Sequence, residues 1–119
     1  MKILILEDNS FRNTKFHQSL TGHIVDIAET VDEGRKLLNN KYDLLFLDHD
    51  LGGEIYVPSG KNTGYEFAQL ISKSINKNVP TIIHSCNPAG SRAIKSILPH
   101  AQMIPFVNLD ITSLISKIN

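Results

Sequence analysis

The chain has 119 residues, of which 41% are hydrophobic and 20% are charged, so its composition excludes a disordered or fibrous protein and allows a buried core. Lysine and arginine together number 12, as do aspartate and glutamate, and this balance argues against duplex DNA as the partner, because nonspecific binding to it needs a basic surface. One cysteine, Cys86, rules out an intramolecular disulfide, and no apolar run reaches the roughly 18 residues of a membrane helix. We expect a single cytoplasmic domain over residues 1–119.

Short apolar runs alternate along the chain with segments of helical spacing. The runs predict strands at residues 2–6, 23–28, 43–47, 80–84 and 101–107. The intervening segments predict five helices. The first ends near residue 19, and the second and third follow the capping patterns Thr30-x-x-Glu33 and Thr63-x-x-Glu66. The fourth begins at Asn87-Pro88, and the fifth follows the cap residue Asp110.

This alternation of strands and helices predicts an α/β fold with a parallel sheet covered on both faces. Five strand–helix units in a chain of this length favour the flavodoxin-like doubly wound fold, with the strand order 2-1-3-4-5. In that fold ligands bind beyond the carboxyl ends of the strands, near the switch point between the first and third strands.

Acidic and imidazole side chains follow three of the predicted strands. Carboxylates crowded at one edge of a sheet repel each other, which raises their pKa values unless a cation is present. Mg²⁺ or Mn²⁺, bound through oxygen ligands, is the divalent metal that this set predicts. The alternative is a set of caps and turn residues spread along the edge. The residues concerned are Glu7 and Asp8 after the first strand, Asp48, His49 and Asp50 after the third, and His84 and Ser85 after the fourth.

Over nearly its whole length the chain resembles the receiver domains of two-component signalling. LILEDN matches their acidic pair after the first strand, Asp48 stands where they carry the phosphoacceptor aspartate, and Ser85 stands where a switch serine or threonine ends the fourth strand. Receivers place a lysine before the proline that follows the fifth strand, but here Met103-Ile104-Pro105 has none. The loop after Asp48 is also longer than theirs. The missing lysine argues against ordinary phosphorelay switching.

Three motifs resemble a narrower group, the cyclic-phosphate processing receiver domain family: DHDLGG at residues 48–53, NTGYE at 62–66 and HSCNPAG at 84–90. The resemblance implies a phosphoesterase that acts on a cyclic phosphate, in a cyclic nucleotide or at an RNA end with a 2′,3′-cyclic phosphate. Since no apolar run is long enough for a membrane helix, we expect no membrane partner, and the oligomeric state stays open.

Opening a cyclic phosphodiester needs a base for water and an acid for the leaving oxygen. Histidine can take either role near neutral pH, so we expect His49 and His84 to flank one phosphate. Asp50 would orient His49 or join the metal shell. The alternatives are a satisfied core histidine at His84 and an outward-pointing turn residue at His49. Asp8 and Asp48 are the predicted direct metal ligands, with Glu7 in the outer shell.

Phosphate binding has its own candidates around the start of the fourth helix. Ser85 and Asn87 lead into the helix N-terminus, whose free N–H groups suit an anion, and Gly90 leaves room in the first turn. Arg92 and Lys61 could add positive charge, and the alternative for both is solvated surface charge.

Two other functions remain open from the sequence. One is a module that captures a cyclic nucleotide without hydrolysing it. The other is a stand-alone response regulator phosphorylated on Asp48, in which the added histidines would have no role.

Overall fold

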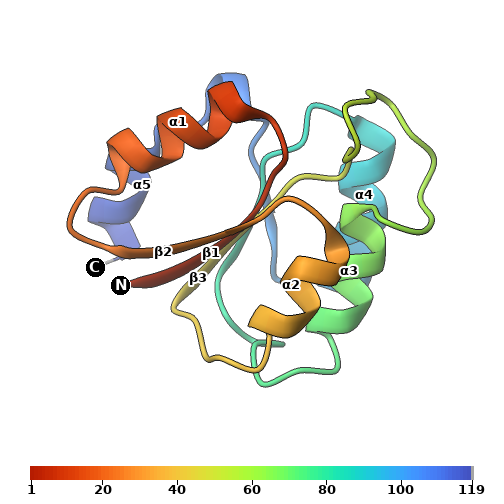
Figure 1. Ribbon diagram of the computed structural model, residues 1–119, viewed down its shortest axis with the longest axis horizontal. Coiled ribbons are helices and arrows are strands. Elements are labelled where there is room, and N and C mark those ends of the chain that lie inside the picture. The colour runs from red at the N-terminus through yellow and green to blue at the C-terminus, as the bar shows by residue number, and fades with distance from the viewer. Residues whose placement is uncertain (119) are drawn as a thin grey trace.

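The computed structural model describes residues 1–118 and has the predicted alternation of strands and helices (Figure 1). Within that range, five parallel strands form one sheet in the order β2-β1-β3-β4-β5, which is the flavodoxin-like order. In chain order the elements are β1 (Lys2–Leu6), α1 (Ser10–Ser19), β2 (Ile24–Ala28), α2 (Val31–Leu37), β3 (Leu44–Leu47), α3 (Gly64–Ile71), β4 (Thr81–Ile83), α4 (Pro88–Ile97), β5 (Gln102–Met103), the 3₁₀ helix η1 (Phe106–Asn108) and α5 (Ile111–Ile118). No helix in this range is long and apolar enough to cross a lipid bilayer.

The helices cover both faces of the sheet (Figure 1). Helices α2, α3 and α4 lie on one face, and α1 and α5 lie on the other. Successive side chains of a strand point to opposite faces, so each central strand feeds two cores. In β3, Leu45 and Leu47 join the core under α2, α3 and α4, whereas Leu44 and Phe46 join the core under α1 and α5.

The register of the central strands brings their carboxyl ends level. Leu6 of β1 pairs with Leu47 of β3, and Leu47 pairs with Ile83 of β4. The residues one step further along the three strands therefore form a row across the sheet.

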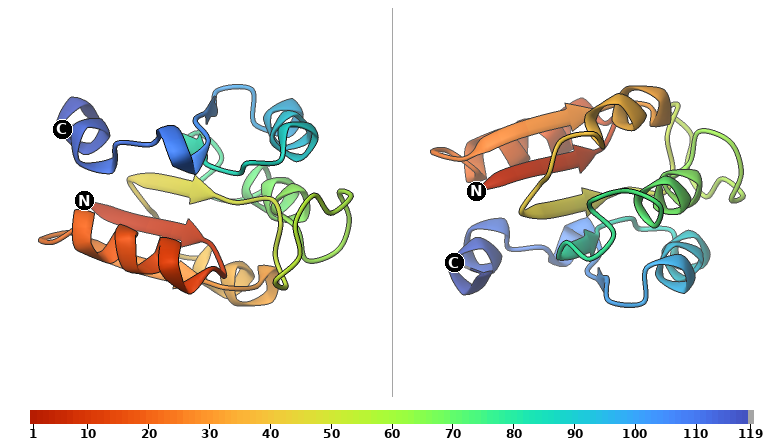
Figure 2. Two further views of the ribbon diagram at one scale, coloured as in Figure 1. Left: turned by 90° about the horizontal axis from the view of Figure 1, so that it is seen from above. Right: turned by 90° about the horizontal axis from the view of Figure 1, so that it is seen from below.

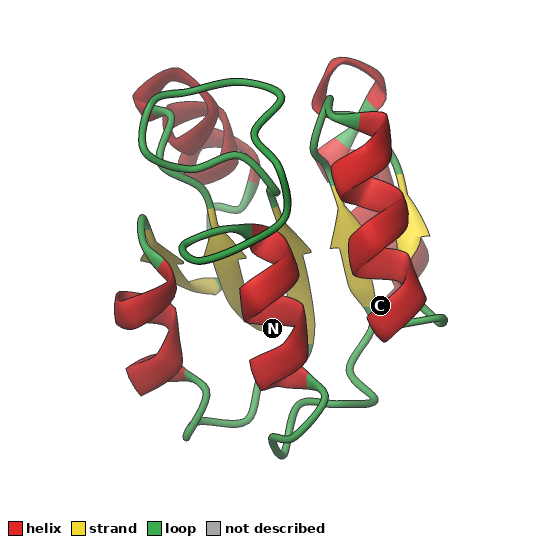
Figure 3. Ribbon diagram, turned by 90° about the vertical axis from the view of Figure 1, so that its right-hand side faces the viewer, coloured by secondary structure: helices red, strands yellow, loops and turns green. Residues whose placement is uncertain are grey.

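A long loop, residues 48–63, joins β3 to α3 at this edge. In Figure 2 (left) the arrowheads of β1 and β3 point toward it, and in Figure 3 it is the green arch at the top, on the side to which the strands point. This loop therefore lies over the edge of the sheet where the sequence predicts the ligand site.

The fifth strand is much shorter than the predicted range of residues 101–107. It covers only Gln102–Met103 at the edge of the sheet, and η1 follows almost at once. Pro105 has no N–H to donate to a ladder, so the strand cannot continue through it. The amide of Phe106 donates instead to the carbonyl of His84, 2.8 Å away, which ties η1 to the end of β4.

Candidate functional site

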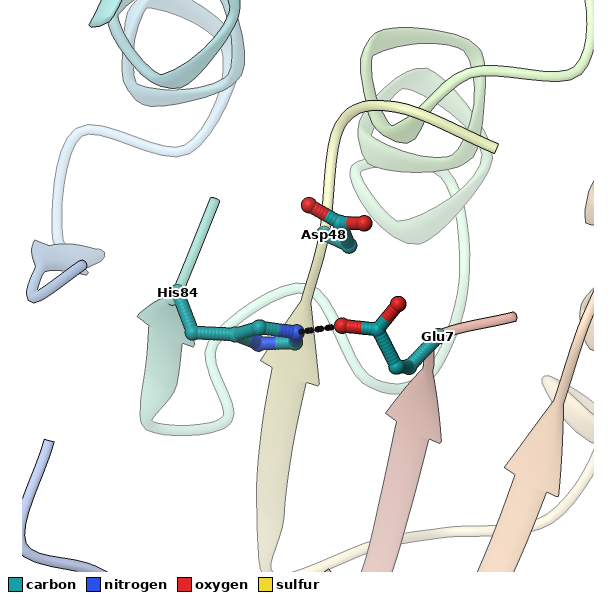
Figure 4. Close-up of side chains that lie close together, drawn as sticks. All are labelled: Glu7, Asp48 and His84. Atoms are coloured by element: carbon teal, nitrogen blue, oxygen red, sulfur yellow. Dashed lines mark hydrogen bonds and ion pairs between the residues drawn. The ribbon is translucent and has the colours of Figure 1, made fainter. Parts of the chain in front are cut away.

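Three buried side chains form the row at the strand ends (Figure 4). Glu7 follows β1, Asp48 follows β3 and His84 follows β4, and none of them is more than 4% exposed. One donor atom from each lies within 4.8 Å of the others. Because the three residues share one face of the sheet, they lie on the side of α1 and α5.

Glu7 is fully occupied by hydrogen bonds. Its Oε1 accepts from His84 Nε2 at 2.9 Å and from Arg12 at 3.3 Å, and its Oε2 accepts from the amides of Asp8 and Asn9 at 3.0 and 3.1 Å. Burial alone would raise the pKa of Glu7, but the hydrogen bonds from His84 and Asn9, together with the Arg12 charge, outweigh it and hold that pKa below its usual value. Glu7 is therefore an ionised carboxylate with no free position for a metal.

His84 is enclosed by aromatic rings. Phe16, Phe106 and Phe46 lie with ring centroids 5.2, 6.1 and 6.4 Å from the imidazole. Burial lowers the pKa of His84, so the ring is neutral near pH 7 and Nε2–H donates to the Glu7 carboxylate. Its Nδ1 has no hydrogen-bond partner among residues 1–118. His84 is thus a buried core histidine with one ring nitrogen bonded to Glu7 and the other without a partner in that range.

Asp48 is the carboxyl group of the row whose ionisation is disfavoured. Burial, and next to it the negative charge of Glu7, raise the pKa of Asp48 to about 8. The amide of His49 and the guanidinium of Arg12, 3.9 Å away, oppose that shift without cancelling it. In the absence of a bound cation, Asp48 therefore holds a proton near neutral pH.

This raised pKa predicts how the stability of the metal-free protein depends on pH. An unfolded aspartate ionises near pH 3.9, so below pH 8 unfolding releases the proton of Asp48, and stability falls as the pH rises. An unfolded histidine is about half protonated at pH 6.5, so the titration of His84 offsets a small part of the Asp48 effect at the lower end of this interval. Between pH 6.5 and 8 the free energy of unfolding should therefore drop by about 1 kcal/mol in all.

Urea unfolding at a series of pH values with a chelator present measures this slope. Asp48→Asn carries no titrating group at this position and should flatten the curve. A wild-type stability that stays level or rises over the same interval would contradict the shift assigned to Asp48.

Arg12 is a site residue that the sequence did not reveal. It lies in the first turn of α1 after the cap residue Asn9, and its guanidinium reaches back to Glu7 and Asp48. Burial would lower the pKa of Arg12, but these two carboxylates outweigh it and raise that pKa. The guanidinium also lies 5.3 Å from the centre of the Phe106 ring and contacts Cys86 Sγ at 3.7 Å.

A cavity of about 350 Å³ opens above the row. The carboxylates of Asp8, Asp48, Asp50 and Glu54 line it, and Arg12 is the cationic side chain in its wall. Four carboxyl groups beside one guanidinium disfavour an anionic ligand, and a bound cation would offset that repulsion. The cavity is also within the size range of small-molecule sites, which is about 300–1,000 Å³.

The loop after β3 is anchored on two of these carboxylates. Asp8 Oδ2 accepts from the amides of Gly52 and Gly53 at 2.6 and 3.0 Å, and both glycines have positive φ angles, of 82° and 80°. Asp50 Oδ2 accepts from the amide of Tyr56 at 2.7 Å. The glycine pair thus lets the backbone turn both amides toward one carboxylate.

His49 points to the other face of the sheet. The imidazole is fully buried, with Nδ1 2.8 Å from Asp50 Oδ1 and Nε2 2.9 Å from Ser59 Oγ. Asp50 has a lowered pKa: burial opposes ionisation, but hydrogen bonds from Asn87, His49 and Tyr56 outweigh it. Because a carboxylate only accepts, the His49 Nδ1–H donates to Asp50, and Nε2 forms a hydrogen bond with the Ser59 hydroxyl.

The structure does not place the two imidazoles around one ligand. Neither His49 nor His84 lines the cavity, and each is bonded to a carboxylate instead. The chain of Asp50, His49 and Ser59 has the order of an activated serine, but Ser59 does not line the cavity either. We interpret these bonds as anchors of the loop, and the acid and base roles of the two histidines stay a prediction.

The predicted phosphate-binding residues are divided by the structure. Ser85 and Asn87 are buried, and Asn87 caps α4 at Gly90 while its Nδ2 donates to Asp50 Oδ1 at 3.0 Å. Gly90 packs on His49, where an added Cβ would lie 2.3 Å from the ring. Arg92 is exposed on α4, and Lys61 is exposed beside a separate hollow near α2. For Arg92 and Lys61 the surface alternative therefore fits the structure.

The donors suited to a hard divalent metal are the oxygens that face the cavity. Asp8 and Asp48 line it from neighbouring strands, with Asp50 beside them. Glu7 and His84 bond each other beside Asp48, and neither of them lines the cavity. The residues present therefore fit the predicted arrangement, with Glu7 outside the direct ligands.

Solved receiver domains share this fold. The receiver domain of the sensor histidine kinase PA1611 from Pseudomonas aeruginosa PAO1, with a magnesium ion coordinated in its active-site cleft, is 20% identical (TM-score 0.74, covering 98% of this chain and 93% of that one). The response regulator TrrA from Thermotoga maritima, in complex with Mg²⁺ and BeF, is 22% identical (TM-score 0.71, 100% of both chains). A CheY-like receiver domain from Methanospirillum hungatei JF-1 is 23% identical (TM-score 0.72, 98% and 89%).

At sequence identities of 20–23%, the similarity to these structures establishes the fold alone. Among curated proteins no relative matches. The profile of the family described as the cyclic-phosphate processing receiver domain matches residues 2–100, a range that includes all three sequence motifs and every carboxylate of the cavity. The chain therefore belongs to the cyclic-phosphate processing receiver domain family.

Proposed function

We propose that this protein is a metal-assisted phosphoesterase that opens a cyclic phosphate, in a cyclic nucleotide or at an RNA end with a 2′,3′-cyclic phosphate. The observation that carries the proposal is the acidic cavity at the switch-point edge, where Asp8, Asp48 and Asp50 meet the guanidinium of Arg12. Membership of the cyclic-phosphate processing family supplies the substrate class.

Asp8 and Asp48 would hold Mg²⁺ or Mn²⁺, as the magnesium in the cleft of the PA1611 receiver domain suggests by analogy. A divalent cation bound there supplies Lewis acidity toward the phosphate oxygens and lowers the pKa of its bound water. Binding requires Asp48 to lose the proton that it holds in the metal-free protein, because only the carboxylate is a ligand.

The remaining cavity residues have separate roles in the proposed reaction. Arg12 lies between Glu7 and Asp48 and offers its remaining N–H groups to a phosphate oxygen. Asp50 is ionised and faces the cavity, so it can accept the proton of the attacking water and then return it to the ring oxygen that leaves phosphorus. Asn87 and His49 hold Asp50 in place from the side of α4.

His49 and His84 act, in this proposal, as positioning residues through Asp50 and Glu7. Residues that orient the groups around a metal site typically contribute 10- to 100-fold, so His49→Ala and His84→Ala should each slow turnover by about that factor. His84→Gln keeps a donor for Glu7 and should recover most of the loss. Steady-state rates measured across pH provide the readout.

A direct acid or base role gives a different result. Each alanine variant would then lose about 10² to 10⁴-fold, together with one limb of the pH–rate profile, and glutamine would not rescue it. Retention of both limbs in the alanine variants supports positioning.

The test of the proposed function is a substrate panel. Cyclic mono- and dinucleotides and an oligoribonucleotide ending in a 2′,3′-cyclic phosphate are incubated with the protein and Mg²⁺, Mn²⁺ or EDTA, and products are followed by phosphorus NMR. Ring opening that needs the metal and disappears in Asp48→Asn is the expected result.

The other two functions correspond to other outcomes. Binding of a cyclic nucleotide with no cleavage under either metal would identify a capture module, in which the metal only bridges phosphate and protein. A lasting acyl phosphate on Asp48 after treatment with acetyl phosphate would identify a response regulator instead.

A further inference from the structure

We propose that Tyr56, with Ile55 beside it, forms a stacking platform for a nucleobase, so that the substrates are nucleoside cyclic phosphates and not base-free cyclic phosphates. This inference rests on the proposed function, because it assumes that the phosphate occupies the acidic cavity. It adds a base-recognition subsite to that cavity and a specificity role for the loop after β3.

The platform lies on the rim of the cavity. Tyr56 and Ile55 line the same cavity as Asp48 and Arg12, yet they are 66% and 78% exposed. Large apolar side chains are usually withdrawn from water, and here two of them lie side by side in the chain at the mouth of a charged pocket. An aromatic ring with one accessible face is what stacking on a base requires.

The backbone at Tyr56 is held in an uncommon conformation. Its φ angle is 55°, in the left-handed region that bulky residues rarely adopt. The Tyr56 amide donates to Asp50 Oδ2 at 2.7 Å, and Asp50 is itself held by His49 and Asn87. The carboxylate proposed to accept a proton therefore also fixes the residue proposed to hold the base. Strain of this kind is found mainly where a side chain serves a ligand.

Charge decides which part of a nucleotide meets Tyr56. The positive charge of the cavity, from Arg12 and the proposed cation at Asp8 and Asp48, lies at the strand ends. The rim near Tyr56 instead carries Glu54, which repels phosphate. The phosphate therefore lies inward and the uncharged base outward, over the aromatic ring.

Base stacking on an aromatic side chain is sequence-tolerant, because every base has a π face. The platform accordingly serves a free mononucleotide or the last base of an RNA strand equally well. A 2′,3′-cyclic mononucleotide and an oligoribonucleotide with the same end separate these two sources.

The experiment compares ligands with and without a base. Affinities of Mg²⁺-loaded protein for adenosine 2′,3′-cyclic phosphate and for base-free ribose 2′,3′-cyclic phosphate are measured by their protection of Cys86 from alkylation, since this cysteine lines the cavity. Tyr56→Ala should weaken the affinity for adenosine 2′,3′-cyclic phosphate by about 5- to 150-fold, the range of one base–aromatic stack. The affinity for the base-free ligand should stay within about twofold of the wild-type value. Tyr56→Phe keeps the ring and should match wild type.

Phe11→Ala is the matched control. Phe11 is 65% exposed but lies in a separate groove between α1 and η1, so its loss should change neither affinity. If wild type binds both ligands with equal affinity, or if Tyr56→Ala lowers both affinities equally, the stacking platform is refuted but the proposed phosphate site is not. If neither ligand protects Cys86, the proposed function fails and the platform fails with it.

Discussion

Asp48→Asn is expected to abolish metal-dependent turnover and to weaken Mg²⁺ binding by more than about 100-fold, because even outer-shell partners of a metal contribute up to that factor. Asp48 is the carboxylate that lies both in the buried row and in the cavity wall. Asparagine is neutral, as protonated Asp48 is, so the metal-free fold should survive the change. Titration calorimetry with Mg²⁺ measures the affinity directly.

Asp32→Asn is the control for the loss of one negative charge. The Asp32 side chain is 91% exposed on α2, away from the cavity, so its removal should leave the affinity unchanged. Equal Mg²⁺ affinity in wild type and Asp48→Asn would remove Asp48 from the metal site and, with it, the central group of the proposed mechanism.

Gly64→Ala is expected to destabilise the protein by about 3 kcal/mol, at the upper end of the usual cost of overpacking a core. A Cβ at Gly64 would lie 2.0 Å from the carbonyl oxygen of Asp48 and 2.8 Å from Ile94 Cδ1. The Gly64 amide also donates to the His49 carbonyl at 3.0 Å, so the first turn of α3 cannot retreat without disturbing the site backbone. The change should therefore reduce both stability and metal affinity.

Gly60→Ala, in the loop that precedes α3, provides the comparison. Nothing lies within 4 Å of a Cβ at Gly60, so chemical denaturation should give a midpoint close to that of wild type. A Gly64→Ala variant as stable as Gly60→Ala would mean that α3 is not packed against the strand end as closely as described.

The alternation of side chains along a strand explains where sequence reasoning about the site succeeded and failed. Helix caps depend on local patterns and the strand order follows from the number of strand–helix units, and the structure has both as predicted. The row of Glu7, Asp48 and His84 was also within reach, because each residue lies one step beyond a residue of the β1–β3–β4 register. Counting the same step places His49 on the opposite face, although the sequence analysis grouped it with His84.

Other features depend on backbone geometry that no local pattern contains. Arg12 reaches the carboxylates only because α1 leaves the cap residue Asn9 in one particular direction. The anchoring of the loop on Asp8 depends on two consecutive positive φ angles, at Gly52 and Gly53. A glycine pair signals a turn, but it does not specify which acceptor the freed amides will find.

The aromatic enclosure of His84 has a consequence for where the functional unit ends. The family match stops at residue 100, but Phe106 packs on His84, lies under the guanidinium of Arg12 and bonds the end of β4 through its amide. A protein cut at the matched boundary would keep every carboxylate of the cavity and lose the ring that supports their histidine and arginine partners. The segment that follows the matched range therefore helps to bury and hold the partners of the shared carboxylates, and relatives that differ only in this segment can differ in metal affinity and in pH response.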